Sequence, residues 1–218
     1  PPPPMSEPRI LLTGFEPFDG EAVNPSWLVA RALDGEYIEG HIVQAVQLRC
    51  VFGAALQGLD KALRQHRPRL VLALGQASRP RVGVERVAIN VDDARIPDNT
   101  GAQPVDTTIV PRGPAAYFSG LPIKAITAAL NEAGVDAEVS QTAGTFVCNH
   151  VFYGLMHRLR HRPGVRGGFI HLPLLPEQAQ RRGQGEGMAL ALMIDGIRRA
   201  LQVALNVERD IEVTGGAV

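Results

Sequence analysis

The stretch Ser140-Gln-Thr-Ala-Gly-Thr-Phe-Val-Cys148-Asn-His150 predicts the end of a strand, a tight bend and the first turn of a helix. The bend falls on the small residues Ala143-Gly144-Thr145. The helix is indicated by apolar residues at the three-and-four spacing of one helical face, namely Val151, Phe152, Leu155, Met156 and Leu159. The stretch therefore joins a strand to a helix that opens with a cysteine.

Cys148 is a candidate nucleophile because of this place in the chain. A thiol in the first turn lies near the positive end of the helix dipole and among unpaired backbone N–H groups. Both are expected to favour the thiolate, which is the nucleophilic form. The same N–H groups can bind the oxyanion that forms when a carbonyl is attacked. The alternative is a buried cysteine that packs as a small apolar side chain.

Strands and helices are predicted to alternate on both sides of this stretch. Strands are expected at residues 9–13, 41–50, 70–74, 83–91, 138–142 and 168–172. Helices are expected from Asn24-Pro25, over 53–66 and 120–134, from Cys148, and over 186–205. The alternation predicts a three-layer α/β/α fold around a largely parallel, twisted sheet, like that of phosphorylases and hydrolases. Residues 5–218 are expected to form one catalytic domain.

The segment from Asp92 to Gly120 interrupts this alternation. It is rich in proline and glycine and is predicted to be irregular. A loop of this length inside a compact domain is usually functional or disordered. It follows a candidate catalytic strand, so we expect it to cover the active site; a floppy insertion is the alternative.

Composition limits the partners that the chain can have. Its 218 residues are 45% hydrophobic, and 22 Lys and Arg balance 22 Asp and Glu. No net field therefore attracts it to nucleic acid or to an anionic membrane. No apolar run is long enough for a membrane span, and no signal peptide is apparent, so we expect a cytoplasmic protein with free thiols. Pro1–Pro4 precede Met5 and are expected to be a remnant of cloning.

Candidate reactive side chains are expected at the carboxyl ends of strands, where open α/β sheets place their sites. Phe15, Phe18, Gln76, Cys148 and His171 occupy such positions. A cysteine nucleophile needs a base to take its proton, and the imidazole of histidine suits this role. A carboxylate often fixes the tautomer of that imidazole.

Glu85 is an acid within an otherwise apolar strand, so it is expected either to be paired or to face solvent. A pair with Arg86 is unfavourable because neighbours on a strand point to opposite faces.

Other histidines and the second cysteine have simpler interpretations. His150 lies two residues after Cys148 on a different helix face, which makes it a poor base for that thiol. His157 and His161 have metal-ligand spacing, but late in a helix they are more often cations near its negative end. Cys50 is expected to be a packed apolar side chain. We therefore expect neither a metal nor a cofactor.

The chain resembles the type I pyroglutamyl peptidases, or pyrrolidone-carboxylate peptidases, over nearly its whole length after Met5. The resemblance rests on Leu12-Thr-Gly-Phe-Glu-Pro-Phe18, Val23-Asn-Pro-Ser26, Gly75-Gln-Ala77, Glu85-Arg-Val-Ala-Ile-Asn90, Ala94-Arg-Ile-Pro-Asp-Asn99, Gly113-Pro-Ala-Ala116, Thr142-Ala-Gly-Thr-Phe-Val-Cys-Asn149 and Ile170-His171. Each block alone is weak or moderate, but their combination in this order is highly specific.

The resemblance implies a cysteine exopeptidase that removes an N-terminal pyroglutamyl residue from peptides through a thioester acyl-enzyme. The family's Glu, Cys and His triad falls on Glu85, Cys148 and His171. The lactam pocket falls on Phe15 and Phe18, with Asn24, Gln76 and Phe146 nearby, and Arg95 falls close to the reacting carbonyl. Family members are commonly homo-oligomers, so a dimer or tetramer is expected.

One segment departs from the family's pattern. Ser78 replaces a second glycine after Gly75-Gln-Ala77, Gly83 replaces a serine or threonine, and the segment between them is one residue short. The departure leaves the triad intact and puts in doubt the shape of this loop beside the substrate.

Two other classes of function agree less well with the sequence. A nucleoside phosphorylase-like enzyme would need a basic cluster for phosphate, but residues 14–20 hold two acids and no Lys or Arg. A ligand-binding protein without catalysis would have no need for the intact Glu, Cys and His set.

Overall fold

The fold is seen in a computed structural model that describes residues 7–214. The expectation about Pro1–Pro4 lies outside the described residues. Among the residues that are described, no helix is both long enough and apolar enough to cross a membrane.

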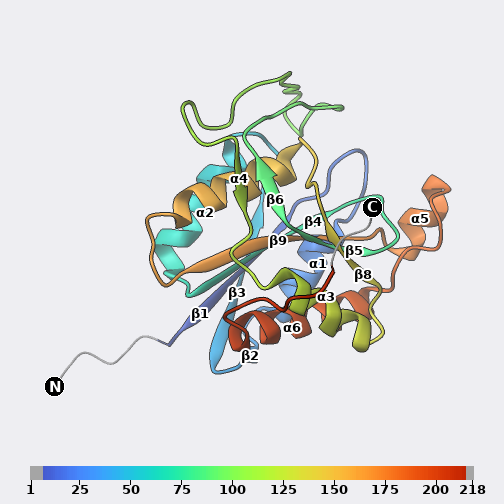
Figure 1. The fold of residues 1–218 in the computed structure, drawn as a ribbon. Coiled ribbons are helices and arrows are strands. Elements are labelled where there is room, and N and C mark those ends of the chain that lie inside the picture. The colour runs from blue at the N-terminus through green and yellow to red at the C-terminus, as the bar shows by residue number, and fades with distance from the viewer. Residues whose placement is uncertain (1–6, 215–218) are drawn as a thin grey trace.

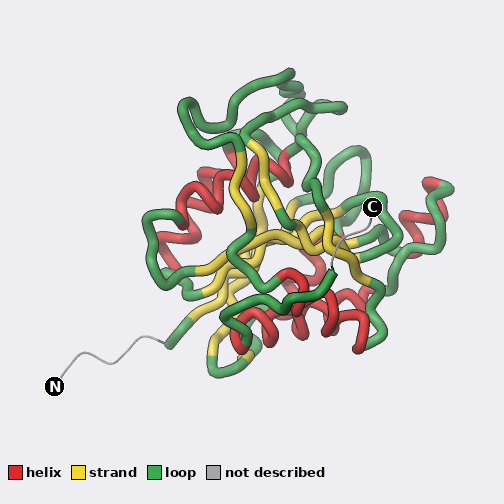
Figure 2. Tube along the Cα trace, viewed as in Figure 1, coloured by secondary structure: helices red, strands yellow, loops and turns green. Residues whose placement is uncertain are grey.

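A seven-stranded sheet runs through the centre of the molecule (Figures 1 and 2). Its order is β2 (Tyr37–Ile38), β3 (His41–Leu48), β1 (Arg9–Phe15), β4 (Leu70–Gln76), β9 (Arg166–Leu172), β5 (Val82–Glu85) and β8 (Ala137–Ser140). Four of the six neighbouring pairs are parallel, and the β2–β3 and β9–β5 pairs are antiparallel. The sheet is therefore largely parallel, as predicted.

Helices cover both faces of this sheet, which confirms the three-layer α/β/α prediction (Figure 1). One face packs against α1 (Pro25–Leu33), α3 (Ile123–Glu132) and α6 (Leu190–Asn206). The other face packs against α2 (Ala54–His66) and α4 (Val147–Leu159). Both faces of β4 are buried in consequence, which explains why its sequence is an uninterrupted apolar run followed by glycine and glutamine.

Local sequence signals predicted the start of one helix correctly and the start of another too early. Asn24 caps α1 by accepting a hydrogen bond of 3.0 Å from the Ser26 backbone N–H, and Pro25 is the first helical residue. The predicted C-terminal helix begins at Leu190 rather than at residue 186. The delay has a backbone cause, because Gly185 and Gly187 have φ values of +76° and +72°, which a right-handed helix does not allow.

The strand predicted over residues 83–91 is two strands in different sheets. β5 ends at Glu85, and β6 (Val87–Ile89) pairs with β7 (Ala116–Phe118) in a separate antiparallel ribbon. The break at Arg86 lets β6 leave the central sheet and lie over α4, where the Asn149 side chain bonds both backbone groups of Ile89. β7 also corrects the prediction that residues 92–120 are irregular throughout. Neither β2 nor α5 (Pro176–Arg182) was predicted.

The direction of β5 and β8 corrects a second expectation. The carboxyl ends of β1, β4 and β9 meet at one edge of the sheet, as predicted for an open parallel sheet. β5 runs antiparallel to β9, and β8 runs with β5. The carboxyl end of β8, which was expected at this shared edge because Cys148 follows it, therefore points the other way. Glu85 reaches the site as a side chain on the face of the sheet.

The long segment between β6 and β7 is fastened to the rest of the molecule by side-chain hydrogen bonds. Asn90 exchanges two hydrogen bonds of 2.9 Å with Val110 across the base of the segment. The Asp98 carboxylate accepts from the backbone of Phe52, next to the start of α2, at 3.0 Å, and Asn99 donates to the Glu16 side chain at 2.9 Å. These bonds hold the segment above the edge of the sheet where β1 and β4 end.

Candidate active site

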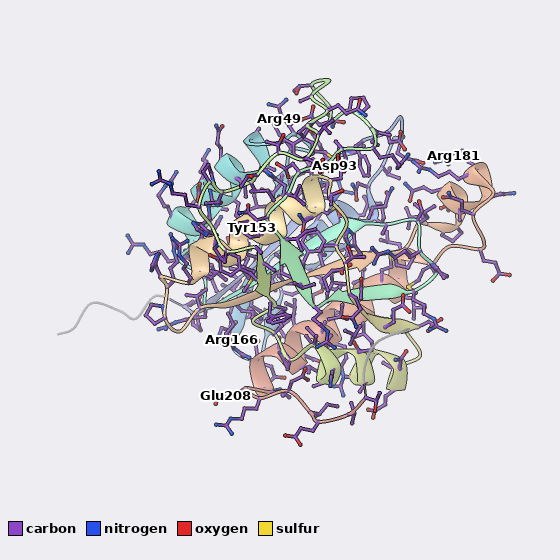
Figure 3. The ribbon with its side chains drawn as sticks, turned by 45° about the horizontal axis from the view of Figure 1, so that its top comes forward. Arg49, Asp93, Tyr153, Arg166, Arg181 and Glu208 are labelled. Carbon is purple, nitrogen blue, oxygen red and sulfur yellow. The ribbon has the colours of Figure 1, made fainter. Side chains whose placement is uncertain are left out.

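Cys148 is the second residue of α4 and is partly exposed to a cavity. The chain reaches it through Gly144, whose φ of +77° is unfavourable for other residues, and through the extended Phe146. The Asp93 backbone N–H donates to the Thr145 carbonyl at 2.9 Å, and Figure 3 shows Asp93 near the start of α4. The start of α4 is thus fixed against the long loop, with the first-turn N–H groups around the thiol unpaired by the helix itself.

Glu85 and His171 are hydrogen-bonded to each other. The register of β5 on β9 places Gly83 opposite His171, so Glu85, two residues further, projects from the same face. His171 Nδ1 lies 2.6 Å from Glu85 Oε1, and both side chains are almost fully buried. A proton on Nδ1 that is donated to the carboxylate leaves Nε2 unprotonated and able to act as a base.

One cavity of about 380 Å³ brings the predicted thiol and imidazole together. Cys148 and His171 both line it, as do the predicted residues Phe18, Gln76, Arg95 and Phe146. Its volume suits a small ligand, and its lining combines aromatic rings with a few polar groups.

Phe15 was predicted to line the lactam pocket and Asn24 to lie nearby, but neither residue lines the cavity that holds Cys148. Phe15 is the last residue of β1 and is 1% exposed, packed in the apolar core between the sheet, α2 and α4. Asn24 caps α1, and its side chain also donates to the Glu16 carbonyl at 3.2 Å. Sequence alone could not separate Phe15 from Phe18, since the choice depends on how far β1 extends.

Aromatic and amide side chains support the rest of the wall. The Phe18 and Phe146 rings lie 6.0 Å apart, and Phe52 packs edge-on against Phe146 at 5.4 Å. Gln178 of α5 donates to Gln76 Oε1 at 3.1 Å, so the Gln76 amide is held with its nitrogen available to a ligand. Gln178 was not predicted because α5 was missed, although Pro176 at its start and Gly183 at its end are helix-boundary signals that could have found it.

Arg79 is a second residue that sequence reasoning missed. It lines the cavity and donates to Glu85 Oε1 at 3.1 Å. Nothing in the local sequence distinguishes it from Arg81, which instead pairs with Asp136 and Glu138 at 3.2 and 3.6 Å. The two arginines differ in where they reach: Arg79 contacts the carboxyl ends of β5 and β8, and Arg81 pairs with residues at the start of β8.

Burial works against the expected ionisation of Cys148. It raises the pKa of the thiol well above its ordinary value, the negative charge of Glu85 adds to the rise, and Arg79 lowers the pKa. The sequence-based expectation of a thiolate stabilised by the helix start considered only one side of this balance. Burial therefore favours the thiol form, whose proton has to be removed when it attacks.

His150 and His157 have hydrogen-bond partners outside the triad, and Cys50 is buried. His150 Nδ1 lies 2.9 Å from Asp92, and its Nε2 accepts from the Gly53 backbone at 3.0 Å. His157 bonds the Tyr117 hydroxyl at 2.8 Å. Burial raises the pKa of Cys50 to about 12. Within residues 7–214, no group of three or more His, Cys, Asp and Glu side chains is placed to hold a metal ion.

Gly75 makes room for the Cys148 thiol, which gives a first prediction. A Cβ at Gly75 would lie 2.6 Å from Cys148 Sγ and 2.8 Å from the Phe169 ring. We expect Gly75→Ala to displace the thiol and to lower kcat by roughly 100-fold, the cost of misplacing a reacting group by about 1 Å. Gly58→Ala is the control, since its methyl meets only the end of the Leu48 side chain, at 3.2 Å. An unchanged kcat in Gly75→Ala would show that the thiol does not depend on this space.

An α/β fold that carries a thiol at a helix start and a carboxylate-bonded imidazole on one cavity has the arrangement of a cysteine hydrolase. Comparison with known proteins gives the particular family. The family model for pyroglutamyl peptidases matches residues 8–207. The chain belongs to the pyroglutamyl peptidase family.

Individual relatives agree along almost the full chain. The pyrrolidone-carboxylate peptidase of Cupriavidus taiwanensis is 58% identical over 212 residues, which are 96% of this chain and 98% of that protein. That of Klebsiella pneumoniae is 60% identical over 209 residues, 95% of this chain and 98% of that protein. The crystal structure of pyroglutamyl peptidase I from Bacillus amyloliquefaciens is 45% identical and superimposes with a TM-score of 0.92, covering 95% of this chain and 100% of that one.

A more distant solved structure has the same fold. Pyrrolidone carboxyl peptidase from Thermococcus litoralis has a TM-score of 0.91 at 35% identity, covering 95% of this chain and 99% of that one. These relationships confirm the predicted family and its cysteine peptidase class, and they leave the phosphorylase-like and non-catalytic alternatives without support.

Proposed function

We propose that this chain hydrolyses the bond after an N-terminal pyroglutamyl residue, with Cys148 as nucleophile, His171 as general acid and base, and Glu85 as the group that orients His171. The observation that carries these roles is the 2.6 Å contact between His171 Nδ1 and Glu85 Oε1 on the wall of the cavity that holds Cys148. Geometry of this kind gives imidazole one fixed tautomer and leaves the other nitrogen for the thiol.

The chemical steps follow from these roles. Cys148 Sγ attacks the pyroglutamyl carbonyl carbon while His171 Nε2 takes the thiol proton, because burial keeps the resting thiol protonated. The C–N bond breaks, the same proton passes to the leaving amine, and a thioester remains. Water then attacks the thioester, His171 accepts a proton from it, and that proton returns to the sulfur as pyroglutamate leaves.

Two sources of positive potential face the developing oxyanion. The first-turn N–H groups of α4 surround the start of the helix that carries the thiol. Arg95 lies on the long segment between β6 and β7, called the covering loop below, and lines the cavity. Its guanidinium can approach the reacting carbonyl there. Preorganised donors of this kind typically supply about 3 to 4 kcal/mol each to the transition state.

The pocket suits a neutral five-membered lactam. Phe18 and Phe146 offer flat apolar walls to the ring, and the Gln76 amide nitrogen can donate to the ring carbonyl. Phe15 and Asn24 contribute from behind, by supporting the loop that carries Phe18.

The direct test is release of a fluorogenic amine from a pyroglutamyl amide. The proposal predicts release by the intact protein and equal rates with and without EDTA, because no step uses a metal. An alanyl amide of the same fluorophore is the control substrate, and turnover of that substrate alone would contradict the assignment.

Glu85→Gln is expected to lower kcat by roughly two to four orders of magnitude. Glutamine keeps the shape but removes the charge that stabilises the imidazolium and selects its tautomer, and a serine triad loses about four orders for the equivalent change. The measurement is kcat on protein whose circular dichroism matches the parent. Glu138→Gln, on the adjacent strand beside Arg81, is the matched control. A kcat equal to that of the parent would remove Glu85 from the triad.

The wider organisation is part of the same proposal. Residues 5–218 act as one catalytic domain, and the free thiols Cys50 and Cys148 suit the reducing cytoplasm. The exposed Phe118 on β7 and Val105 on the covering loop, 73% and 71% exposed, suit a homo-oligomeric contact. Sedimentation of the parent and of Phe118→Glu tests that contact, and identical masses would exclude Phe118 from it.

A further inference from the structure

Arg79 joins the carboxylate of the site to the strand that leads to Cys148. Its Nη1 donates to Glu85 Oε1 at 3.1 Å and to Ser140 Oγ at 2.8 Å. Its Nη2 donates to the Thr142 carbonyl at 2.9 Å. One guanidinium therefore bridges the end of β5, the end of β8 and the loop that continues to α4.

The space for this guanidinium exists because residue 83 has no side chain. A Cβ at Gly83 would lie 3.3 Å from Arg79 Nη1 and 3.4 Å from Glu85 Oε1. Gly83 and Glu85 are on the same face of β5, so any side chain at 83 would project toward the bridge. Both Arg79 and Gly83 fall in the segment where the sequence departs from the family's pattern.

Glu85 needs a cation beside it. The carboxylate is completely buried, and within the described part of the chain its Oε2 has no hydrogen-bond partner. A buried carboxylate without a compensating charge takes up a proton instead. His171 and Arg79 both bond to Oε1, so these two contacts are the ones that compensate the charge of the Glu85 carboxylate.

We propose that Arg79 is a positioning residue for the triad: its guanidinium lies beside the buried Glu85 carboxylate, holds it aimed at His171, and ties Glu85 to the loop that leads to Cys148. The inference rests on the proposed function, since it assigns Arg79 to the same catalytic site. Arg79 acts through Glu85 and takes no part in bond making or breaking.

Other charged and titratable groups around the pair are accounted for. Cys148 faces it from α4, and Asp93 and Arg95 face the cavity from the covering loop. Asp19 and Arg182 lie at the rim, where Arg182 forms its own ion pairs with Asp19 and Glu21. Arg79, in contrast, donates a hydrogen bond to the Glu85–His171 pair.

Removing the cation makes proton uptake by the Glu85–His171 pair easier, whichever of the two groups takes the proton. We expect Arg79→Met to lower kcat by roughly 10- to 100-fold, as loss of a group supporting a site residue typically does. The acid limb of kcat/KM should move to higher pH by about one pH unit. KM for the pyroglutamyl amide should change less than threefold, because the substrate contacts remain.

Arg79→Lys is expected to keep the acid limb near its parent position, because it retains the charge, and to recover part of kcat. Arg81→Met, two residues along the same loop, is the matched control and should leave kcat and the pH profile unchanged. Gly83→Ala, which crowds the bridge without removing the charge, should lower kcat with little shift of the acid limb. This variant also keeps the test available if Arg79→Met does not fold.

Three outcomes would overturn the inference. One is a parent-like kcat and pH profile in Arg79→Met, and another is an equal fall of kcat at every pH without a shift of the acid limb. The third is a rise in KM alone, which would make Arg79 a substrate contact. Failure of the proposed function is separate from these, because it would appear as a parent enzyme that does not hydrolyse the pyroglutamyl amide at all.

Discussion

Cys148→Ala is expected to abolish turnover of pyroglutamyl amides, with kcat falling by roughly four to six orders of magnitude. Loss of the nucleophile in a serine peptidase costs about six orders. No neighbour can replace it here, because the other thiol, Cys50, is 3% exposed and does not line the cavity. The measurement is single-turnover and steady-state release of the fluorogenic amine by the purified variant.

Cys50→Ala is the matched control and should retain kcat within a few-fold. Iodoacetamide should modify Cys148 and leave Cys50 unmodified in the folded protein, as read by mass spectrometry of the digested chain. The difference follows from access and ionisation, since burial raises the pKa of Cys50 to about 12. Full activity after complete alkylation of Cys148 would contradict the mechanism.

The pH dependence of this activity follows from the state of the thiol. Burial raises the pKa of Cys148, so near neutral pH the thiol is protonated and attack requires His171 as base. Activity should fall as the pH drops, because a protonated imidazole cannot accept the thiol proton, and no thiolate–imidazolium pair should be present at rest. Titration of the thiolate absorbance near 240 nm in the parent and in Cys148→Ala checks this, and a thiolate signal at pH 7 that the variant lacks would contradict it.

Features that depend only on residues close together in the chain could be predicted from the sequence. The cap formed by Asn24 and Pro25, the apolar run of β4 and the strand-to-helix bend before Cys148 are all local signals. The three layers follow from their alternation. The long loop was found as well, because its prolines and glycines exclude regular structure over most of its length.

What the sequence could not supply depends on contacts between distant segments. The antiparallel placement of β5 on β9 decides that Glu85 meets His171, and no local pattern encodes strand direction. The path of the loop before β5 likewise decides which arginine reaches Glu85, because Arg79 bonds its carboxylate and Arg81 pairs with Asp136 and Glu138. The balance between the helix start and burial at Cys148 likewise needs the packed structure, because burial is a property of the surroundings.

Selectivity for the lactam is expected to be strong, and it tests the pocket as a whole. Prolyl amides have the same ring size as pyroglutamyl amides, but their ring nitrogen is a protonated amine and their ring has no carbonyl. A cation placed beside Phe18 and Phe146 would lose most of its hydration, and the attraction of the ring faces would offset only part of that cost. The Gln76 amide nitrogen would also lose its acceptor, because Gln178 already occupies the Gln76 oxygen.

These two penalties act together, so kcat/KM for the prolyl amide should be lower by roughly four to five orders of magnitude. Phe18→Ala should weaken pyroglutamyl binding while Cys148 stays reactive toward small alkylating agents. Phe15→Ala is the informative counterpart, because Phe15 is a core residue and its loss should cost about 3 to 5 kcal/mol of folding stability. Comparable kcat/KM values for pyroglutamyl and prolyl amides would rule out the lactam pocket, and a Phe15→Ala variant as stable as the parent would place that ring outside the core.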